Sequence, residues 1–313
     1  MWRTFIPCRE GGRSMRSLSR RSFLRATAGA GVLGAGLAVG AGVSAARPAA
    51  PGPADWMGEL DSATFLSRLA IPGTHDSGAL HGGGLVQCQD VGIAPQLDAG
   101  IRFLDVRCRA IDGSFAIHHG AFFQEIMFGD VLNDCQAFLA AHPSETVLMR
   151  VKQEYSTVPD DEFGTIFADY ARRWPDLLHT ESRIPRLGEA AGRVVVLADN
   201  GGVPGIGWGS DLLDISDDYD IGTIEDLEKR KWPGVAEHLD AARAYPVGDP
   251  EKLYLTFTSS SGWALWPRSA HEAIWPKVTG YLDAVDPVAS LGLVVLDFTD
   301  DTKAEQVYRF NFA

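Results

Sequence analysis

Apolar residues in this chain of 313 residues gather into short runs that are separated by polar, turn-forming stretches. Eight such runs, several of them rich in Val, Ile and Leu, are typical of strands buried in a parallel sheet. They cover residues 69–72, 101–106, 115–117, 146–151, 193–197, 212–215, 253–257 and 291–296. The run at 212–215 is the weakest of the eight.

Between several of these runs the apolar residues recur at the spacing of an amphipathic helix. The segments that show this spacing are 130–141, 162–174 and 271–285. Strands that alternate with helices predict an α/β fold, here a single-domain (β/α)8 barrel of the TIM type, closed on itself. The second and third runs are too close together for an intervening helix, so we expect a distorted barrel.

The first 45 residues have a different pattern. Residues 19–25 read SRRSFLR, an uncharged stretch rich in Ala and Gly follows at 26–43, and Val43-Ser44-Ala45 is a small-residue cleavage site. This order is typical of a twin-arginine export signal. A membrane anchor is the alternative, but the stretch has few large apolar residues. We therefore expect a signal at 1–45, a flexible linker at 46–53, a folded domain at 54–313 and secretion from the cell.

Charge narrows the possible partners. The chain has a net charge of −13, and removal of residues 1–45 would take away seven arginines and one glutamate to leave −19. Nucleic-acid binding is not expected, because it requires a basic surface. Attraction to an anionic membrane is disfavoured for the same reason, so lipid contact would depend on apolar side chains. Trp263, Trp266 and Trp275 fit either membrane insertion or internal packing.

Cysteine usage gives a weaker constraint. Beyond residue 45 the chain has Cys88, Cys108 and Cys135, so at most one disulfide can form and one thiol stays free. No CxxC pair is present, and a zinc site built on cysteines is therefore not expected.

Ionisable residues follow several of the predicted strands. In such barrels the chemistry lies at the carboxyl ends of the strands. The residues at these positions are His75 and Asp76 after the first run, Arg107 after the second, His118 and His119 after the third, Lys152 and Glu154 after the fourth, and Asp297 after the eighth. Five strands that bring such groups to one face predict an active site there.

Two histidines and an arginine suit the cleavage of a phosphodiester by a neighbouring hydroxyl. One imidazole removes the hydroxyl proton, the other protonates the leaving oxygen, and the guanidinium balances charge on the phosphate. This scheme needs no metal. Structural alternatives remain open: Asp76 and Asp297 could cap helices, Arg107 could pair with Asp105, and the His118–His119 pair could be structural or bind metal.

Seven segments together resemble the bacterial phosphatidylinositol-specific phospholipases C. They are IPGTHDSG at 71–78, IRFLDVRCR at 101–109, FAIHHG at 115–120, PSETVLMRVKQEY at 143–155, GRVVVLAD at 192–199, LYLTFTSSSG at 253–262 and GLVVLDF at 292–298. The resemblance covers most of the chain after residue 53 and implies a distorted α/β barrel.

The resemblance also implies a role for each site residue and a pair of products. The roles are general base for His75 with Asp297 as its partner, general acid for His119 assisted by Asp76, phosphate binding for Arg107, and inositol binding for Lys152, Asp217 and Tyr219. The implied products are diacylglycerol and inositol 1,2-cyclic phosphate. No cofactor or metal is implied, and the expected partner is phosphatidylinositol at a membrane interface, contacted peripherally by a monomer.

One residue departs from the family pattern, and two other functions remain as alternatives. Asp199 stands where family members have a basic residue that touches inositol, which leaves the headgroup identity open. A metal-dependent glycerophosphodiester phosphodiesterase would need a Glu-x-Asp pair where this chain has Asp105-Val106-Arg107. A secreted lipid- or glycan-binding barrel without activity would be expected to lack a histidine or the arginine, and both are present.

Overall fold

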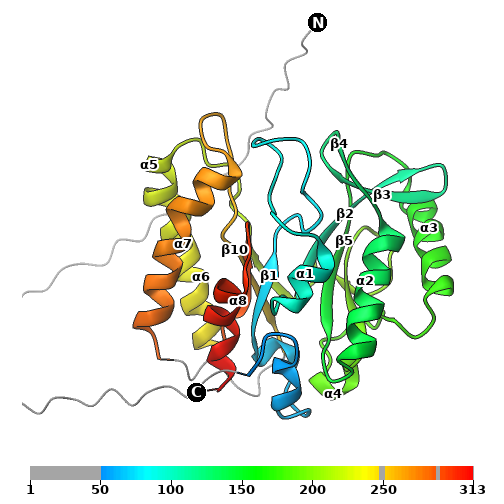
Figure 1. Ribbon diagram of the computed structural model, residues 1–313, viewed down its shortest axis with the longest axis horizontal. Coiled ribbons are helices and arrows are strands. Elements are labelled where there is room, and N and C mark those ends of the chain that lie inside the picture. The colour runs from blue at the N-terminus through cyan, green and yellow to red at the C-terminus, as the bar shows by residue number, and fades with distance from the viewer. Residues whose placement is uncertain (1–50, 247–250, 287–289, 313) are drawn as a thin grey trace, which may run out of the picture. The chain divides into compact units, whose positions relative to one another are not determined.

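The computed structural model describes residues 51–246, 251–286 and 290–312 (Figure 1). These residues belong to one compact unit that begins at Ala46. The expected export signal at 1–45 and the first part of the linker lie outside the described residues. Of the helices in the described part, none is long and apolar enough to span a membrane.

A parallel sheet forms the centre of this unit. Eight of its strands follow the order β6-β7-β5-β2-β1-β11-β10-β9, and every neighbouring pair is parallel. Their bounds are β1 Ala70–Thr74, β2 Phe103–Ile111, β5 Val147–Gln153, β6 Leu178–His179, β7 Val194–Asp199, β9 Leu213–Ser216, β10 Leu253–Phe257 and β11 Gly292–Leu296. Short β8 (Ile206–Gly207) also pairs with β7. The predicted α/β fold with a distorted barrel is confirmed.

The prediction that the barrel closes is wrong for the part of the chain that the structure describes. There the sheet curls but ends at β6 and β8 on one side and at β9 on the other, with no hydrogen bonds between these edges. β6 and β8 have two residues each. Strands this short provide too few backbone groups to complete the ring of paired strands.

The run at 115–117 is a strand, but its predicted place as a parallel barrel strand is wrong. It lies in β3 (Ser114–His119), which is antiparallel to both β2 and β4 (Phe122–Met127). The reason is local. Asp112 and Gly113 both have positive φ, +47° and +71°, as a two-residue hairpin turn requires. The chain therefore reverses beside β2 instead of crossing over.

Helices surround the sheet, and the three predicted ones are confirmed. They correspond to α2 (Phe128–Ala141), α3 (Asp160–Arg173) and α7 (Pro267–Ala284). The other helical elements are η1 Trp56–Glu59, η2 Leu66–Arg68, α1 Ile93–Asp98, α4 Leu187–Ala190, α5 Ile224–Asp226, the π-helical η3 Leu227–Lys231, α6 Trp232–Ala244, α8 Asp301–Tyr308 and η4 Arg309–Phe312. In Figure 1, α2 and α3 lie on the side of β5, and α6 and α7 on the side of β10.

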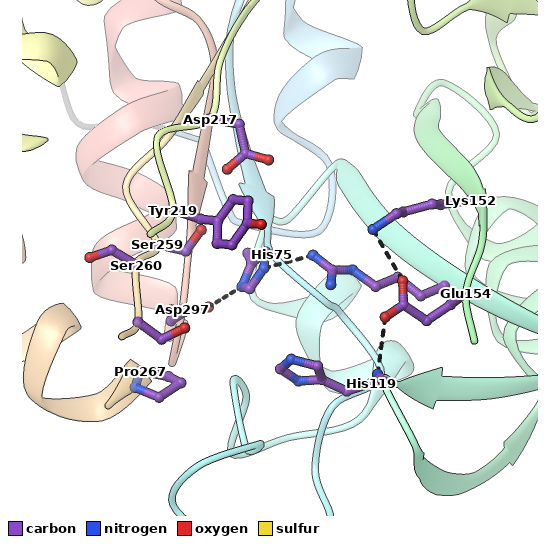
Figure 2. Close-up of a pocket in the computed structure, with 13 residues that line it drawn as sticks. His75, His119, Lys152, Glu154, Asp217, Tyr219, Ser259, Ser260, Pro267 and Asp297 are labelled. Carbon is purple, nitrogen blue, oxygen red and sulfur yellow. Dashed lines mark hydrogen bonds and ion pairs between the residues drawn. The ribbon is translucent and has the colours of Figure 1, made fainter. Parts of the chain in front are cut away.

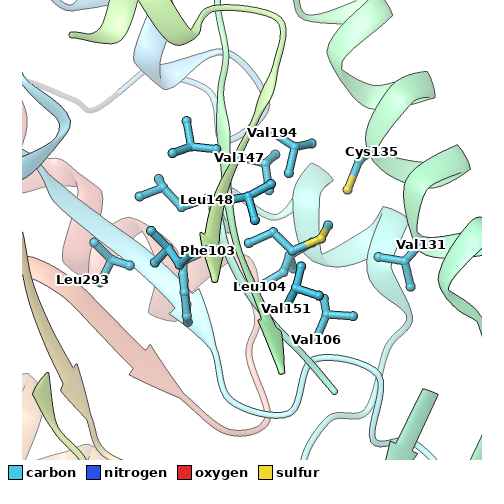
Figure 3. Packing of buried hydrophobic residues seen from close by; sticks show 14 of the residues in the cluster. Phe103, Leu104, Val106, Val131, Cys135, Val147, Leu148, Val151, Val194 and Leu293 are labelled. Atoms are coloured by element: carbon cyan, nitrogen blue, oxygen red, sulfur yellow. The ribbon is translucent and has the colours of Figure 1, made fainter. Parts of the chain in front are cut away.

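Residues of β2 alternate between the two faces of the sheet, and this alternation positions the site. Leu104 and Val106 point toward α2 and pack in the same cluster as Val131 (Figure 3). The residues that alternate with them face the inside of the barrel. There the ring of Phe103 meets the ring of Phe257 edge to face, with 6.4 Å between the ring centres. Asp105 and then Arg107 continue this inner row toward the mouth of the barrel.

Candidate active site

The carboxyl ends of the strands surround a cavity of about 370 Å³. Among the residues that line it are seven of the eight predicted site residues, namely His75, Arg107, His119, Lys152, Asp217, Tyr219 and Asp297 (Figure 2). The eighth, Asp76, is buried and contacts two of them, Arg107 and His119. Sequence segments up to 222 residues apart thus meet at one site.

His75 follows β1 and is held at both ring nitrogens. Nδ1 lies 2.8 Å from Oδ1 of Asp297, and Nε2 lies 2.8 Å from Nη2 of Arg107. Because a guanidinium only donates hydrogen bonds, Nε2 accepts one from Arg107. The ring proton is therefore on Nδ1, which donates a hydrogen bond to Asp297. Burial lowers the pKa of His75, but the charge and hydrogen bond of Asp297 outweigh burial and raise it overall. The ring is thus a base whose lone pair faces Arg107.

His119 ends β3 just before Gly120, whose φ of +54° begins the turn to β4. Its Nδ1 lies 2.7 Å from the carbonyl oxygen of Val86 and 3.2 Å from Oδ2 of Asp76. The ring lines the cavity and its side chain is one-quarter exposed, so Nε2 is the nitrogen available to a ligand. An imidazole held in this way can donate a proton from Nε2.

Neighbouring His118 faces away from the cavity. It is buried in a separate groove beside Phe123, with ring centres 5.7 Å apart, and burial lowers its pKa. Adjacent residues of a strand point to opposite faces. The second histidine of the pair is therefore the one in the site.

Arg107 is surrounded by carboxylates. Nη2 lies 3.2 Å from Oδ2 of Asp105, and Nη1 lies 3.4 Å from Oδ2 of Asp76. Burial lowers the pKa of Arg107, but these two carboxylates raise it by more, so the guanidinium remains charged. The ion pair with Asp105 and a role in binding an anion are compatible, because Arg107 also lines the cavity.

Asp76 is strained and has unused acceptor capacity. Its φ is +40°, a region that residues other than glycine rarely adopt, and it is fully buried. Neither carboxylate oxygen accepts a hydrogen bond from any described residue. Burial raises the pKa of this carboxyl, against the lowering effect of Arg107 and His119. Strain and burial of this kind are often found at functional sites.

Hydrogen-bonding groups line the rest of the cavity. Lys152 pairs with Glu154 at 3.1 Å, and Glu154 accepts a hydrogen bond from the backbone N–H of Gly120, beside His119. Asp217 and Tyr219 follow β9, and the ring of Tyr219 is 62% exposed. One oxygen of Asp217 is buried without a partner among the described residues. These groups leave capacity for a polyhydroxylated ligand.

Two lining residues, Ser259 and Ser260, were not predicted. Both hydroxyls are buried, and neither has a hydrogen-bond partner in the described part of the chain. Their position directly after β10 is the signal that could have identified them.

Asp199 does not line this cavity. Its Oδ2 accepts hydrogen bonds from Nε and Nη2 of Arg150 at 2.9 and 2.5 Å, and Arg150 stacks on the ring of Trp208 at 3.9 Å. Arg150 also reaches Oδ1 of Asp105 at 3.3 Å. Asp199 is therefore a counterion of Arg150, and Arg150 in turn helps to hold the carboxylate that contacts Arg107.

Groups that could hold a metal ion meet around one thiol. Cys88 lies within 4.8 Å of ligand atoms of His75 and Asp297, and also of Asp76 and His119. Like Cys108 and Cys135, it is buried and free, so none of these three cysteines forms a disulfide. The described residues thus include two three-residue clusters with ligand chemistry, both inside the candidate site.

The chain was compared with families and proteins of known function. Residues 71–199 match the model of the phosphatidylinositol-specific phospholipase C X domain. The chain is 27% identical over 282 residues to a 1-phosphatidylinositol phosphodiesterase of Listeria monocytogenes, covering 82% of this chain and 84% of the relative. It is 28% identical over 287 residues to the Staphylococcus aureus (strain Newman) protein of the same name, covering 80% of this chain and 89% of that protein.

Solved structures show the same similarity. The phosphatidylinositol-specific phospholipase C from Listeria monocytogenes superposes with a TM-score of 0.75 at 26% identity, over 83% of this chain and 99% of that one. A Staphylococcus aureus phosphatidylinositol-specific phospholipase C, solved in work on modulation of its membrane binding, gives a TM-score of 0.71 at 25% identity. That match covers 83% of this chain and 98% of the other.

Proposed function

Because the chain belongs to the family of bacterial phosphatidylinositol-specific phospholipases C, we propose that it cleaves phosphatidylinositol to diacylglycerol and inositol 1,2-cyclic phosphate. The proposed reaction uses two histidines and no metal cofactor. One observation carries this proposal: His75, Arg107 and His119 line the same cavity, and each has a carboxylate beside it.

The first step is proton removal by His75. Its Nε2 takes the proton of the inositol 2-hydroxyl, and the hydroxyl oxygen attacks phosphorus. Arg107, which donates to Nε2 in the free enzyme, then turns to the phosphate oxygens and balances their charge. Asp297 accepts a hydrogen bond from Nδ1–H of His75 at 2.8 Å and so stabilises the imidazolium that forms.

The second step is proton donation by His119. As an imidazolium it gives Nδ1–H to the carbonyl of Val86, with Asp76 beside it, and gives its Nε2 proton to the diacylglycerol oxygen. The bond from phosphorus to that oxygen breaks, and the cyclic phosphate remains. Each acid or base step contributes about 10²–10⁴ in rate. Lys152, Asp217 and Tyr219 are proposed to bind the inositol ring.

The metal-dependent phosphodiesterase is disfavoured by the state of Asp105. Oδ2 of this carboxylate receives Arg107 and the backbone N–H of Asp76, and Oδ1 receives Arg150. Two guanidiniums already neutralise it, so a cation there would have to displace one of them. The alternative of a binding protein without activity is disfavoured because no member of the acid–base set is missing.

Apolar side chains near the cavity support peripheral contact with a membrane. Trp263 is 84% exposed and Trp266 is 51% exposed, while Trp275 is buried and stacks on His271. Trp266 precedes Pro267, which lines the cavity, and packs beside Gly84 in the loop that also holds exposed Leu85. Indole rings favour the interface between water and lipid.

We also propose that the protein is exported through a twin-arginine signal at 1–45 and acts outside the cell as a monomer. The basis is the sequence pattern of this segment. Mass spectrometry of the protein recovered from culture medium tests it: cleavage after Ala45 is expected, and an intact N-terminus retained in the cell would contradict the proposal.

The decisive experiment is turnover of phosphatidylinositol vesicles by the purified chain in excess EDTA. We expect activity to persist and phosphorus NMR to detect the cyclic phosphate before any inositol 1-phosphate. Loss of activity that returns with added metal would support the metal-dependent alternative. Absence of turnover with or without metal would support a binding protein.

A further inference from the structure

The thiol of Cys88 lies between the two acid–base pairs of the site. Its Sγ is 3.8 Å from Nδ1 of His119, and its other close contact is the carbonyl oxygen of Val86 at 3.4 Å. It is fully buried. The acid–base scheme gives this thiol no role, although it is within 4.8 Å of ligand atoms from both pairs.

The distances around Cys88 match those of a tetrahedral metal site. Zinc binds thiolate at about 2.3 Å and imidazole nitrogen or carboxylate oxygen at about 2.0–2.2 Å, so its ligand atoms lie roughly 3.2–3.6 Å from one another. Nδ1 of His119 lies 3.2 Å from Oδ2 of Asp76 and 3.8 Å from Sγ of Cys88. The third distance, from Sγ of Cys88 to a carboxylate oxygen of Asp76, is within 4.8 Å, so the thiol and the carboxylate would have to move closer to share one ion.

Asp76 supplies an independent sign of unused ligand capacity. It is fully buried, and neither of its oxygens accepts a hydrogen bond from a described residue, although Oδ2 has ion-pair contacts with Arg107 at 3.4 Å and His119 at 3.2 Å. The other candidate cluster differs, because Oδ1 of Asp297 already has a 2.8 Å hydrogen bond with His75. A cation therefore has more to gain at Asp76 than at Asp297.

Charge around the thiol also favours a cation. Ligand atoms of Asp297 and of Asp76 lie within 4.8 Å of the sulfur, whereas the guanidinium of Arg107, 3.4 Å from Oδ2 of Asp76, opposes a cation. A divalent ion would have to displace Arg107 from Oδ2 of Asp76, but because it also displaces the thiol proton it would add only one net positive charge to the site.

We propose that Asp76, Cys88 and His119 form a binding site for a thiophilic divalent cation such as Zn²⁺, which inhibits the enzyme. The ion exchanges for the proton of Cys88, so that a sulfur–metal bond replaces the S–H bond and the proton goes to solvent. The neutral ring of His119 binds as the tautomer with its proton on Nε2, so the metal replaces the hydrogen bond between Nδ1 and the carbonyl of Val86. Inhibition rests on the proposed function, whereas binding does not. A metal on Nδ1 of His119 makes the Nε2 proton harder to give away than in an imidazolium, so the general acid is lost.

Binding is tested without substrate, by titrating the full chain with Cd²⁺ and recording the thiolate-to-metal absorption in the ultraviolet. We expect one equivalent to give the band in wild type and in C135A, which removes another buried free thiol. We expect no band in C88A or in C88S, a second variant that keeps the side-chain volume. Persistence of the band in both Cys88 variants would overturn the site.

Inhibition is tested with Zn²⁺ on phosphatidylinositol vesicles, in a buffer that does not bind metal. Wild type and C135A should lose turnover and regain it with EDTA. C88A should need at least about 10-fold more Zn²⁺, because loss of even an outer-shell partner of a ligand has this effect. Equal sensitivity of C88A and wild type would contradict the regulatory role. A band with no turnover in any variant would contradict the proposed function and leave the site in place.

Discussion

At the scale of single residues, two histidines in similar positions differ in what holds them. His75 gives a hydrogen bond to Asp297, whereas His119 lies beside Asp76, which accepts none. The carboxylate of Asp297 stabilises the positive charge of a protonated His75 ring. The carboxylate of Asp76 is buried and strained, and it interacts more strongly with the charge of Arg107 than with that of His119. Both histidines lead to predictions that separate their roles.

Replacing His119 should remove the general acid without unfolding the chain. We expect H119A to lower kcat on phosphatidylinositol about 10²–10⁴-fold, because a lost acid step costs this much, with an unchanged unfolding midpoint in urea. H118Q is the matched control, since the neighbouring ring lies in another groove. Comparable losses of kcat in both variants would rule out a specific role for His119.

Neutralising Asp297 should change the pH dependence of the rate. Asp297 raises the pKa of His75 above its ordinary value, against burial, and the base works only when unprotonated. In wild type, kcat/KM therefore falls as the pH drops through this raised pKa. In D297N the pKa of His75 falls, so the acidic limb should move to lower pH while the plateau decreases. A limb that stays in place or moves upward would show that Asp297 does not act on the base.

At the scale of elements, an ion-pair chain crosses three neighbouring strands. Asp199 of β7 holds Arg150 of β5, and Arg150 contacts Asp105 of β2, which contacts Arg107. The strands are in parallel register here, with Asp105 beside Arg150. Through this chain Asp199 affects the site from outside the cavity.

Removing Asp199 should therefore cost stability more than substrate binding. We expect D199A to lower the free energy of unfolding by about 1–3 kcal/mol, because buried Arg150 loses its closest hydrogen-bond acceptor. The side chain of Asp199 is itself a quarter exposed. KM should change little. D169A, which breaks an exposed pair with Arg172, is the control and should stay within about 0.5 kcal/mol. The check is urea denaturation followed by fluorescence. If D199A lowered the free energy of unfolding as little as D169A does, the ion-pair chain would have no structural role.

At the scale of the whole molecule, the proposed function requires a strongly acidic protein to reach its substrate in a lipid surface. The net charge of −13 opposes anionic lipid, so the binding energy must come from apolar contact. Exposed Trp263, Trp266 and Leu85 are the side chains proposed to make that contact. Under the proposed function, membrane binding therefore depends on a few apolar side chains and not on the net charge of the protein.

Removing one indole should separate membrane binding from catalysis. We expect W263A to bind phosphatidylinositol vesicles about 10-fold more weakly, equivalent to about 1.4 kcal/mol. Its hydrolysis of water-soluble inositol 1,2-cyclic phosphate should match wild type. Vesicle co-sedimentation and the soluble assay measure the two quantities. W275A is the contrast, because that ring is buried and its loss should lower stability. Weaker turnover of the soluble substrate by W263A would mean that the indole acts in the site itself.

The sequence alone predicted most of the framework, and seven of the eight predicted site residues line one cavity. Apolar runs mark strands because a strand covered on both faces must be apolar throughout, and the ionisable residue after each run, such as His75 after β1, lies at the mouth of the barrel. Alternation along a strand also indicated that His118 and His119 point to opposite faces, and the family resemblance indicated which of the two lies in the site. These features depend on local sequence, so reading along the chain was enough to find them.

Only the tertiary structure decided how distant segments pair. Helix α6 has a weaker apolar pattern and a proline near its start, so its periodicity did not identify it. The open edge of the sheet, the Asp199–Arg150 pair and the position of Cys88 all join residues that are far apart in sequence. Such contacts depend on how strands curl and stack, and no local pattern records this. The sequence therefore determines which ionisable residues the site contains. The tertiary structure determines which charged groups each of them contacts.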